Sequence, residues 1–454
     1  MDGKFTLLPR RGGSLRGSLP KFLIAIILLC TVLVWLAGSV YRRDTLASAP
    51  LAADRPTPTH ISYEPDSISG FVETPAPPPV EEQPTTPNSK VGLKHWWGVE
   101  SPYHFRGEGP RNRTQIGREK ASLVMLVRNR ELKDALSAMK DIEDRFNRHY
   151  RYPWTFFNDE PFSEEFKLHT SRMASGEVQY GLIPKEHWSL PTNIDEKKFR
   201  EKMKEMADKK IIYGGSESYR HMCRYNSGFF WQSPLLKDFD WYWRVEPSTS
   251  FYCDQLYDPF TFMRENGKRY SFVMTMYEFR ATIETLWSST REFAKKHPEY
   301  IAEDNSLGFI VDDYKDKNSL FKKDFNLCHF WSNFEIADLN LWRSQAYRDY
   351  FAFLDAKGGF FYERWGDAPV HSIAASLFLP KDQIHFFHDI GYRHPPYKRC
   401  PQDDESTDYG RCQCPFNKGE SFDFDGYSCQ KRWWKFHNQD DSGNPIPSYK
   451  IPDF

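Results

Sequence analysis

The chain has 454 residues and a formal net charge of -1, with 61 lysines and arginines against 62 aspartates and glutamates. This balance lacks the basic footprint of nucleic-acid-binding proteins, so no nucleic-acid partner is expected. Aromatic residues make up 16% of the chain. Such a content excludes an extended disordered protein, because disordered chains have too little apolar area to offset the entropy of ordering.

Residues 22–41 form an uncharged run with the length of a bilayer-spanning helix. Residues 1–21 hold five basic residues against one acidic residue, so the positive-inside rule predicts a cytosolic tail and a lumenal remainder. The alternative is a cleaved signal peptide, whose apolar core would be shorter and end at a small-residue cleavage site. No such site precedes Arg42. The sequence therefore predicts a single transmembrane signal anchor in the type II orientation.

Residues 42–91 are rich in proline, and 10 of the 31 prolines of the chain lie between residues 44 and 90. Dense proline disfavours regular hydrogen bonding and favours an extended, solvated chain. This segment is predicted to be a stem, and residues 92–454 a folded lumenal domain. A glycosylation sequon at Asn112 fits a lumenal surface.

Seven of the eight cysteines follow the predicted anchor, which itself contains Cys30. An oxidising compartment would pair six of them and leave one over. The last four predict a disulfide-stapled C-terminal lobe of open connectivity. A zinc site is the alternative, but their C-x11-C-x-C-x14-C spacing lacks the usual CxxC knuckle. These four residues are Cys400, Cys412, Cys414 and Cys429.

The lumenal part alternates strand-like and helix-like patterns, which predicts a parallel sheet covered by helices. Residues 121–127 form an apolar run typical of a buried strand, and residues 132–146 follow with helical spacing. Residues 152–157 and 240–245 are further strand candidates, and residues 197–210 predict a solvated helix. No dinucleotide-binding or P-loop glycine motif is present, so oxidoreductase and P-loop interpretations lose their main support.

Two strand ends are candidate site positions, because ligands of open α/β sheets collect at the carboxyl ends of strands. Arg128 follows the first strand and Glu246 follows the strand at residues 240–245. A carboxylate there can ligate a hard divalent cation that neutralises a diphosphate leaving group. The structural alternative is a surface glutamate that caps a turn.

Glu335 and Asp338 have the i, i+3 spacing of one helix face, and we expect a helix to start there. A carboxylate among aromatic rings would have its pKa raised by desolvation, as acid–base or nucleophilic work requires. The commoner use is a helix-start carboxylate that faces the helix dipole. Further along, His394 precedes two prolines and is a candidate metal ligand or base, with a structural histidine as the alternative.

Five sequence strings carry a resemblance to a known family. Together with the tail, anchor and stem, they resemble the fungal Golgi α-1,2-mannosyltransferases of glycosyltransferase family 15, over about residues 120–434. The strings are CRYNSGFFW (223–231), YWRVEPSTSFYCD (242–254), CHFWSNFEIADL (328–339), GGFFYERWGDAPVHSIAASLFL (358–379) and DIGYRHPPYKRCP (389–401).

The resemblance implies a GT-A-like α/β fold, in which helices cover a mixed sheet, and a location in the Golgi membrane. It also implies GDP-mannose as donor, Mn2+ as cofactor and retention at the anomeric carbon. The product would be α-1,2-linked mannose on mannose of protein O- and/or N-linked glycans, in cell-wall mannoprotein glycosylation. The acceptor partner would be a mannosylated glycoprotein.

The family's site residues carry over to six positions of this chain. Two resemble metal ligands, one resembles the carboxylate at the reacting face of the donor sugar, and three resemble residues around the donor and acceptor. They are Glu246 and His394 for the metal, Glu335 for the sugar, Tyr219 and Arg244 for donor and acceptor, and Arg128 near the diphosphate.

One position departs from the family pattern, which usually reads Glu-Pro-Asp where this chain has Ser248 after Pro247. We expect activity with altered metal or acceptor preference. The alternative is a non-catalytic mannan-binding or scaffold protein on the same fold, and the joint retention of Glu246, Glu335 and His394 argues against it. A glycoside hydrolase is a more distant alternative, because hydrolysis needs no nucleotide–metal site.

Overall fold

The computed structural model describes residues 118–314, 316, 318–401, 411–414 and 420–437 of the protein. All of them belong to the unit Pro87–Phe454. Among these residues no helix has both the length and the apolar character that crossing a membrane requires. The predicted tail, anchor and stem, like the sequon at Asn112, fall outside the described residues and stay predictions.

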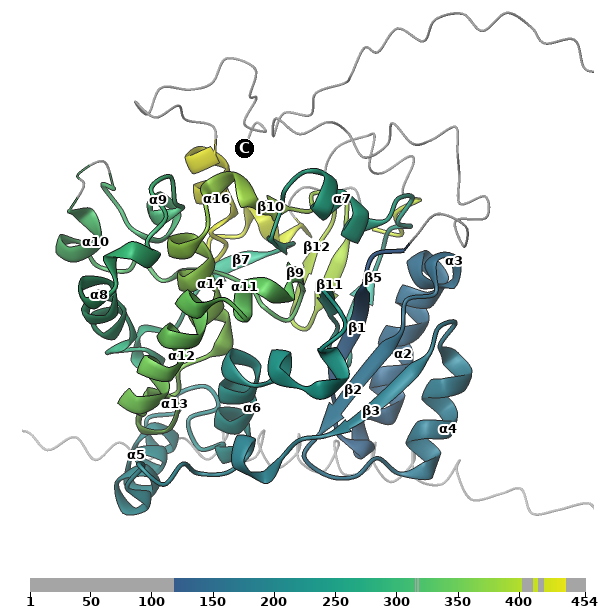
Figure 1. Ribbon diagram of the computed structural model, residues 1–454, viewed down its shortest axis with the longest axis horizontal. Coiled ribbons are helices and arrows are strands. Elements are labelled where there is room, and N and C mark those ends of the chain that lie inside the picture. The colour runs from purple at the N-terminus through teal and green to yellow at the C-terminus, as the bar shows by residue number, and fades with distance from the viewer. Residues whose placement is uncertain (1–117, 315, 317, 402–410, 415–419, 438–454) are drawn as a thin grey trace, which may run out of the picture. The chain divides into compact units, whose positions relative to one another are not determined.

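A seven-stranded mixed sheet runs through the middle of this unit (Figure 1). Its order is β10-β6-β9-β4-β1-β2-β3, and β9 alone of these strands runs antiparallel to its neighbours. The parallel pairing of β1 with β2 and β4 confirms the sheet that the alternating pattern predicts. The strands are β1 Ala121–Leu126, β2 Trp154–Asn158, β3 Val178–Leu182, β4 Trp241–Arg244, β6 Tyr270–Phe272, β9 Glu335–Asp338 and β10 Ile384–Phe386.

Two smaller antiparallel sheets complete the arrangement around the site. One has the order β12-β11-β5, and the other pairs β7 with β8. The pairing of β11 with β5 brings the end of β11 beside the chain that leaves β4, which is how His394 reaches Glu246. The strands are β5 Ser250–Phe251, β7 Thr275–Tyr277, β8 Cys328–Phe330, β11 Tyr392–His394 and β12 Tyr397–Arg399.

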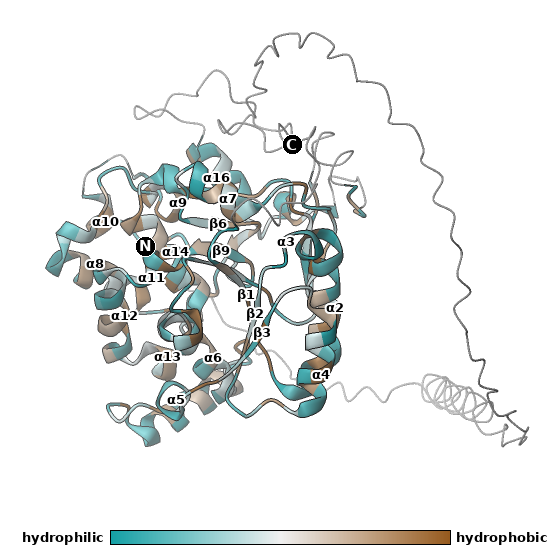
Figure 2. Cartoon of the chain, turned by 45° about the vertical axis from the view of Figure 1, so that its right-hand side comes forward, coloured by the Kyte–Doolittle hydropathy of each residue, from teal (hydrophilic) through white to brown (hydrophobic). Residues whose placement is uncertain are grey.

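Helices cover both faces of the central sheet, because successive side chains of a strand point to opposite faces. In β1, Leu123 and Met125 pack with helix α2, whereas Val124 packs in a second core with helix α6. Figure 2 shows hydrophilic and hydrophobic residues on the same helices, α2 and α4 among them. The main helices are α2 Leu132–Ile142, α4 Glu164–Met173, α5 Glu196–Asp208, α6 Glu217–Gly228, α7 Pro259–Glu265, α8 Leu286–Lys296, α12 Gln345–Lys357, α14 Asp367–Phe378 and α16 Gln430–His437.

Short helices occupy the connections, and several helices are capped as their sequences predict. Ser216 begins α6 by accepting the backbone N–H of Tyr219, and Ser163 begins α4 in the same way. Each such cap satisfies an N–H group that the helix itself leaves without a partner. The short helices are α3 Arg148–Tyr150, α9 Leu307–Ile310, α10 Ser319–Lys322, α11 Leu339–Trp342 and α13 Gly359–Tyr362.

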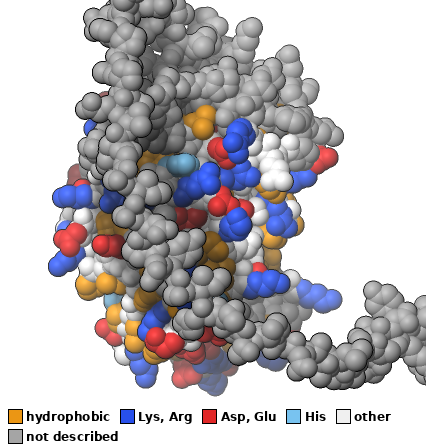
Figure 3. Space-filling view, turned by 90° about the vertical axis from the view of Figure 1, so that its right-hand side faces the viewer, with side chains coloured by type: hydrophobic (Ala, Val, Ile, Leu, Met, Phe, Trp, Pro, Cys, Tyr) orange, Lys and Arg blue, Asp and Glu red, His pale blue; other side chains and the backbone are white. Residues whose placement is uncertain are grey.

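The visible described surface in Figure 3 intermixes Lys and Arg with Asp and Glu side chains. Many of these charges pair locally, as Lys204 does with Asp208 at 2.6 Å along α5. Exposed pairs of this kind contribute about 0–1 kcal/mol each. The stability of the fold therefore comes mainly from the two aromatic-rich cores.

The prediction of a helix start at Glu335 is wrong. Residues Glu335–Asp338 form strand β9, and its antiparallel pairing with β4 places Glu335 opposite Arg244. Helix α11 begins only after β9, where the Asp338 side chain caps it by accepting the N–H of Asn340 at 2.8 Å. The spacing of the two carboxylates suggested a shared helix face, but pairing on both sides of β9 decides the conformation.

Three disulfides and one buried free cysteine, Cys223, account for the cysteines of the described residues. This confirms six paired cysteines with one left over, and it excludes the zinc alternative for the C-terminal set. Disulfides staple the C-terminal region, and two of the three bridges connect it to cysteines earlier in the chain, a connectivity that the sequence left open. Cys253 pairs with Cys412, Cys328 with Cys429, and Cys400 with Cys414.

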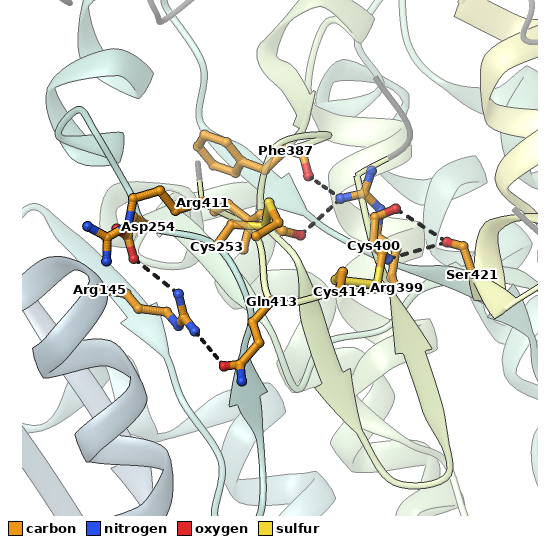
Figure 4. The surroundings of a disulfide bond; sticks show 12 residues. Arg145, Cys253, Asp254, Phe387, Arg399, Cys400, Arg411, Gln413, Cys414 and Ser421 are labelled. Atoms are coloured by element: carbon orange, nitrogen blue, oxygen red, sulfur yellow. Dashed lines mark hydrogen bonds and ion pairs between the residues drawn. A yellow bond between two sulfur atoms is a disulfide. The ribbon is translucent and has the colours of Figure 1, made fainter. Parts of the chain in front are cut away.

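The C-terminal segment is thus bound to the body of the domain (Figure 4). Beside the Cys400–Cys414 bridge, the Arg399 guanidinium donates to the backbone oxygens of Phe387 and Ile390 at 3.2 and 2.9 Å. Gln413 accepts a hydrogen bond from Arg145, and its backbone N–H donates to Tyr252 at 2.7 Å. Removing a bridge here would loosen the β11–β12 hairpin that carries His394.

Thiol counting provides a test of this bonding pattern. A fragment of residues 92–454, denatured without reductant, should react at one thiol, that of Cys223. The folded fragment should react at none, because Cys223 is buried and burial raises its pKa. Reduction should destabilise the fold by about 2–5 kcal/mol for each lost bridge. Finding several reactive thiols in the unreduced fragment would contradict the three bridges.

Candidate active site

A cleft of about 540 Å³ opens where β1, β2 and β4 end, as the strand-end rule predicts. Its volume lies within the range of pockets that bind small molecules and cofactors. Residues from five segments line it. They include Arg128 and Glu131 after β1, Asn158 and Asp159 at the end of β2, Tyr213, Ser216, Ser218 and Tyr219 around the start of α6, Glu246 and Ser248 after β4, and His394 at the end of β11.

The two residues predicted as metal ligands lie next to each other in this cleft. The Nε2 atom of His394 lies 3.4 Å from the Oε2 atom of Glu246, and about a quarter of each side chain is exposed. The indole of Trp331 packs edge-on against the His394 ring, with 5.0 Å between ring centroids. A carboxylate oxygen and an imidazole nitrogen therefore lie close together at a point that solvent and a bound molecule can reach.

Arg244 is the buried ion-pair partner of Glu246. Its guanidinium pairs with the Glu246 carboxylate and with Asp367 Oδ2, and it lies 3.4 Å from the Ser332 hydroxyl. That hydroxyl in turn donates to Asp367 at 2.8 Å. Burial alone would raise the pKa of Glu246, but the charge of Arg244 and the contact with His394 outweigh it and hold that pKa at about 2. Glu246 is therefore an anion at any physiological pH, as a cation ligand must be.

The residues present fit a divalent cation that arrives with its nucleotide. The described part of the chain contains no cluster of three or more metal-ligating side chains, so Glu246 and His394 would supply two ligands. A hard cation of the Mg2+ type is commonly held by one or two side chains, substrate phosphates and water. An anionic carboxylate beside an imidazole suits such a shared site.

Arg128 and Tyr219 line the same cleft as Glu246 and His394. The Arg128 guanidinium donates to the Ser218 hydroxyl at 2.9 Å. The Tyr219 ring stacks against Tyr213 at 4.3 Å between centroids, and the Arg364 guanidinium lies 5.2 Å from the Tyr219 centroid. Because Tyr213 is 55% exposed, this stacked pair offers a flat aromatic surface at the rim.

Glu335 does not line the cleft. Its side chain is 0% exposed and accepts hydrogen bonds from the hydroxyls of Tyr242 at 2.6 Å and Tyr270 at 3.0 Å. The Nδ1 atom of His371 lies 2.8 Å from the same carboxylate. Burial and the Glu335 charge raise the pKa values of both tyrosines well above the usual range, so both hydroxyls remain donors.

A small void separates this buried network from the cleft. It has a volume of about 20 Å³, enough for about one water molecule, and Tyr242, Arg244, Glu246 and Asn226 contribute to its walls. Glu335 therefore lies one side chain behind the wall that Glu246 forms. The aromatic, water-excluding setting predicted for Glu335 is present, but direct access to it is not.

Sequence reasoning missed three residues of the site. Asp367, the partner of Arg244, lies in the string of residues 358–379 that carries the family resemblance, but it is not among the six site positions carried over from the family. Asn158 is 1% exposed, lines the cleft and has a side-chain amide nitrogen without a hydrogen-bond partner among the described residues. The strand-end rule applied to β2 would have found it, whereas no local signal marks Tyr213.

A carboxylate–histidine pair at the strand ends of a mixed sheet, beside a cleft of this size, can hold a divalent cation together with a phosphorylated ligand. Comparison with known proteins identifies the class of protein as a glycosyltransferase. The profile of the family described as Glycolipid 2-alpha-mannosyltransferase matches residues 81–438. The chain belongs to this family, glycosyltransferase family 15, and is a glycosyltransferase.

Relatives and solved structures support this membership. Glycolipid 2-alpha-mannosyltransferase of Saccharomyces cerevisiae is 55% identical over 320 residues, which cover 70% of each chain. Alpha-1,2 mannosyltransferase KTR1 of the same yeast is 53% identical, over 70% of this chain and 79% of that protein. The Mn/GDP form of core-mannan synthase A from Aspergillus fumigatus superposes with a TM-score of 0.65 at 40% identity, over 72% and 87% of the two chains. Ktr4p of S. cerevisiae in complex with GDP has a TM-score of 0.66 at 38% identity, over 71% and 83%.

The family departure at Ser248 lies in the cleft wall. Ser248 adopts a left-handed backbone conformation, with φ of 63°, which is uncommon for residues other than Gly, Asn and Asp. The aspartate of the family would suit this conformation better. Its loss leaves the Glu246–His394 pair unchanged, so the site keeps both candidate cation ligands.

Proposed function

We propose that this protein transfers mannose from GDP-mannose, with retention, onto a mannose of protein O- and/or N-linked glycans and forms α-1,2 linkages. The observation that carries the proposal is the Glu246–His394 pair, 3.4 Å apart in a cleft at the strand ends. A scaffold protein would have no need of an anionic carboxylate held in place by a buried arginine. The names of the relatives and the GDP in the solved structures support the donor and the linkage.

Glu246 and His394 would hold Mn2+, which supplies Lewis-acid stabilisation to the diphosphate leaving group. Arg244 fixes Glu246 in its ionised form and orientation through their ion pair. Arg128 adds a positive charge to the lining of the same cleft. The stacked rings of Tyr213 and Tyr219 present a platform for the nucleobase, and the unpartnered amide of Asn158 can donate a hydrogen bond to the nucleotide.

The buried position of Glu335 bears on the reaction route. Its carboxylate is enclosed by Tyr242, Tyr270 and His371, so attack on the anomeric carbon would require this network to open. We therefore favour a role in which the negative charge of Glu335 stabilises positive charge at the anomeric centre, in a low-dielectric site where such interactions are strong. A double displacement remains the alternative route for a retaining enzyme.

The place of action follows from the sequence. The uncharged run of residues 22–41 and the basic tail before it support a type II protein of the Golgi membrane with a lumenal catalytic domain. The disulfides support an oxidising compartment. Cell-wall mannoprotein glycosylation would be the process that uses this activity.

The test is transfer by the full-length protein in detergent. With GDP-mannose, Mn2+ and methyl α-mannoside or an O-mannosylated peptide, we expect a product whose NMR spectrum shows an α-1,2-linked mannose. UDP-glucose serves as the control donor and should give no product. Hydrolysis without transfer, or a β-linked product, would contradict the proposal.

The catalytic domain should also work without its tether. A fragment of residues 92–454 should transfer mannose with a kcat/KM within about twofold of the full chain, because the proline-rich stem is an extended spacer. The two proteins would be compared in the same detergent buffer with methyl α-mannoside. A folded fragment that binds GDP but transfers no mannose would show that the stem or anchor contributes to the site.

A further inference from the structure

A run of aromatic rings leads away from the cleft, beginning at His394. Neighbouring rings in this aromatic run lie 5.0–6.3 Å apart between centroids, and they come from four separate chain segments. The order is His394, Trp331, Tyr397 and Tyr427, after which the run divides to Tyr277 and Phe279.

These rings differ from the core rings in their exposure. Trp243 and Phe330 are 1% and 0% exposed and lie in the two cores. Every ring of the aromatic run keeps accessible surface instead, and Phe279 is 48% exposed. Single exposed aromatics are ordinary, but a connected series that starts at a reactive site suggests a binding surface.

The aromatic run is built on a stiff support. Strands β7 and β8 pair beneath it, and the Tyr277 N–H donates to the backbone oxygen of Tyr427 at 3.2 Å. The Cys328–Cys429 bridge ties β8 to the residue before α16. A surface held this way loses little conformational entropy when a ligand binds.

Polar groups accompany the rings. Glu278, between Tyr277 and Phe279, pairs with Arg364 at 3.5 Å, and because both side chains are buried this pair supports the rings and does not itself contact a ligand. A second cavity of about 400 Å³ adjoins the far end, lined by Tyr277 and by the polar side chains of Asp425, Ser428 and Lys435 among others. Apolar surfaces with a few polar groups to fix orientation are the usual make-up of a ligand site.

This combination matches the surface of a pyranose chain. A sugar ring presents C–H groups on its faces, which pack on flat aromatic rings, and hydroxyls around its rim, which need hydrogen-bond partners. We propose that the aromatic run binds the part of an acceptor oligomannose chain that lies behind the mannose receiving the transfer. This inference rests on the proposed function, since it assigns the terminal mannose to the cleft beside His394.

The binding has a kinetic consequence. Each mannose beyond the terminal one would add contact area along the aromatic run, so kcat/KM should rise with acceptor length. Phe279 does not line the catalytic cleft. Its replacement should therefore remove only the increase in kcat/KM that long acceptors show over short ones. Leu182 is 58% exposed at the edge strand β3 and provides a matched control for the loss of an exposed apolar side chain.

The experiment compares full-length wild type, Phe279→Ala and Leu182→Ala with methyl α-mannoside and α-1,2-mannotetraose as acceptors. Phe279→Ala should lower kcat/KM for mannotetraose roughly tenfold, equivalent to about 1.4 kcal/mol, and leave methyl α-mannoside within twofold. Leu182→Ala should change neither. Two results would overturn the aromatic run as an acceptor surface. One is a wild type whose kcat/KM does not depend on acceptor length. The other is a Phe279→Ala variant whose kcat/KM falls equally with both acceptors or with neither.

A binding measurement separates this inference from the proposed function. Calorimetric titration of mannotetraose should give a Kd that Phe279→Ala weakens about tenfold, whether or not transfer occurs. If mannotetraose binds in this way but the wild type transfers no mannose, the proposed function fails and the glycan surface stands. If methyl α-mannoside is mannosylated but mannotetraose binding does not depend on Phe279, the assignment of the aromatic run as a glycan surface is wrong and the proposed function stands.

Discussion

Glu335→Gln should destabilise the protein by about 3–5 kcal/mol, because it leaves the buried ring of His371 without its carboxylate partner. The two ring nitrogens of His371 face the Glu335 carboxylate and the backbone oxygen of Asn226. A glutamine nitrogen facing Tyr242 would meet a hydroxyl that already accepts from Trp342. The melting temperature of the variant, measured beside wild type, checks this loss.

The same variant tests the chemical role of Glu335. If its charge stabilises the developing positive centre, turnover for each folded molecule should fall at least about 100-fold, while GDP still binds. Tyr270→Phe is the matched control, because it removes one hydrogen bond to Glu335 and keeps the charge; it should cost about 1 kcal/mol and change turnover only slightly. Normal turnover with normal GDP affinity in Glu335→Gln would leave Glu335 a purely structural residue.

Glu246→Gln should reduce transfer at least about 100-fold at low Mn2+ and raise the concentration of Mn2+ needed for GDP binding. The change keeps the shape of the side chain but removes the negative charge that a hard cation requires. Arg244 keeps its second anionic partner, Asp367, so the fold should survive. Titration of Mn2+ at fixed GDP, followed by calorimetry, measures the shift directly.

The control for this variant is another carboxylate of the same cleft. Asp134 lines the cleft and is exposed, and its side chain takes no part in the Glu246–His394 contact. Asp134→Asn removes one negative charge from the cleft and should leave the Mn2+ requirement within about twofold. An unchanged Mn2+ dependence in Glu246→Gln would mean that the carboxylate is not a ligand.

The sequence predicted those parts of the site that depend on local pattern. The apolar run of β1 and the strand-like run of β4 can each be recognised as a strand from its own sequence. The strand-end rule then places Arg128 and Glu246 at the same edge of the sheet. His394 was a candidate because two prolines follow it, and the family resemblance added its assignment as a metal ligand. Its position depends on β11 pairing with β5, two segments whose register no spacing rule supplies.

The residues that local reasoning misplaced or missed depend on long-range pairing. Glu335 lies in β9 because that strand is inserted antiparallel between β4 and β6. The carboxylates of Glu335 and Asp338 have the spacing of a helix face by coincidence. Asp367 is a site residue because its carboxylate meets Arg244 from a helix 123 residues further along the chain. Such partnerships exist only after the sheet and α14 have come together.

The disulfides also set an order of events during synthesis. Every bridge has at least one cysteine at position 400 or beyond, and Cys253 and Cys328 precede their partners by 159 and 101 residues. At about 5–20 residues per second, Cys253 emerges roughly 8–32 s before Cys412 can pair with it. During that interval the nascent domain carries reactive thiols and lacks the hairpin with His394. A ribosome that stops within that interval would therefore release a chain that has Glu246 but lacks His394 and carries unpaired cysteines.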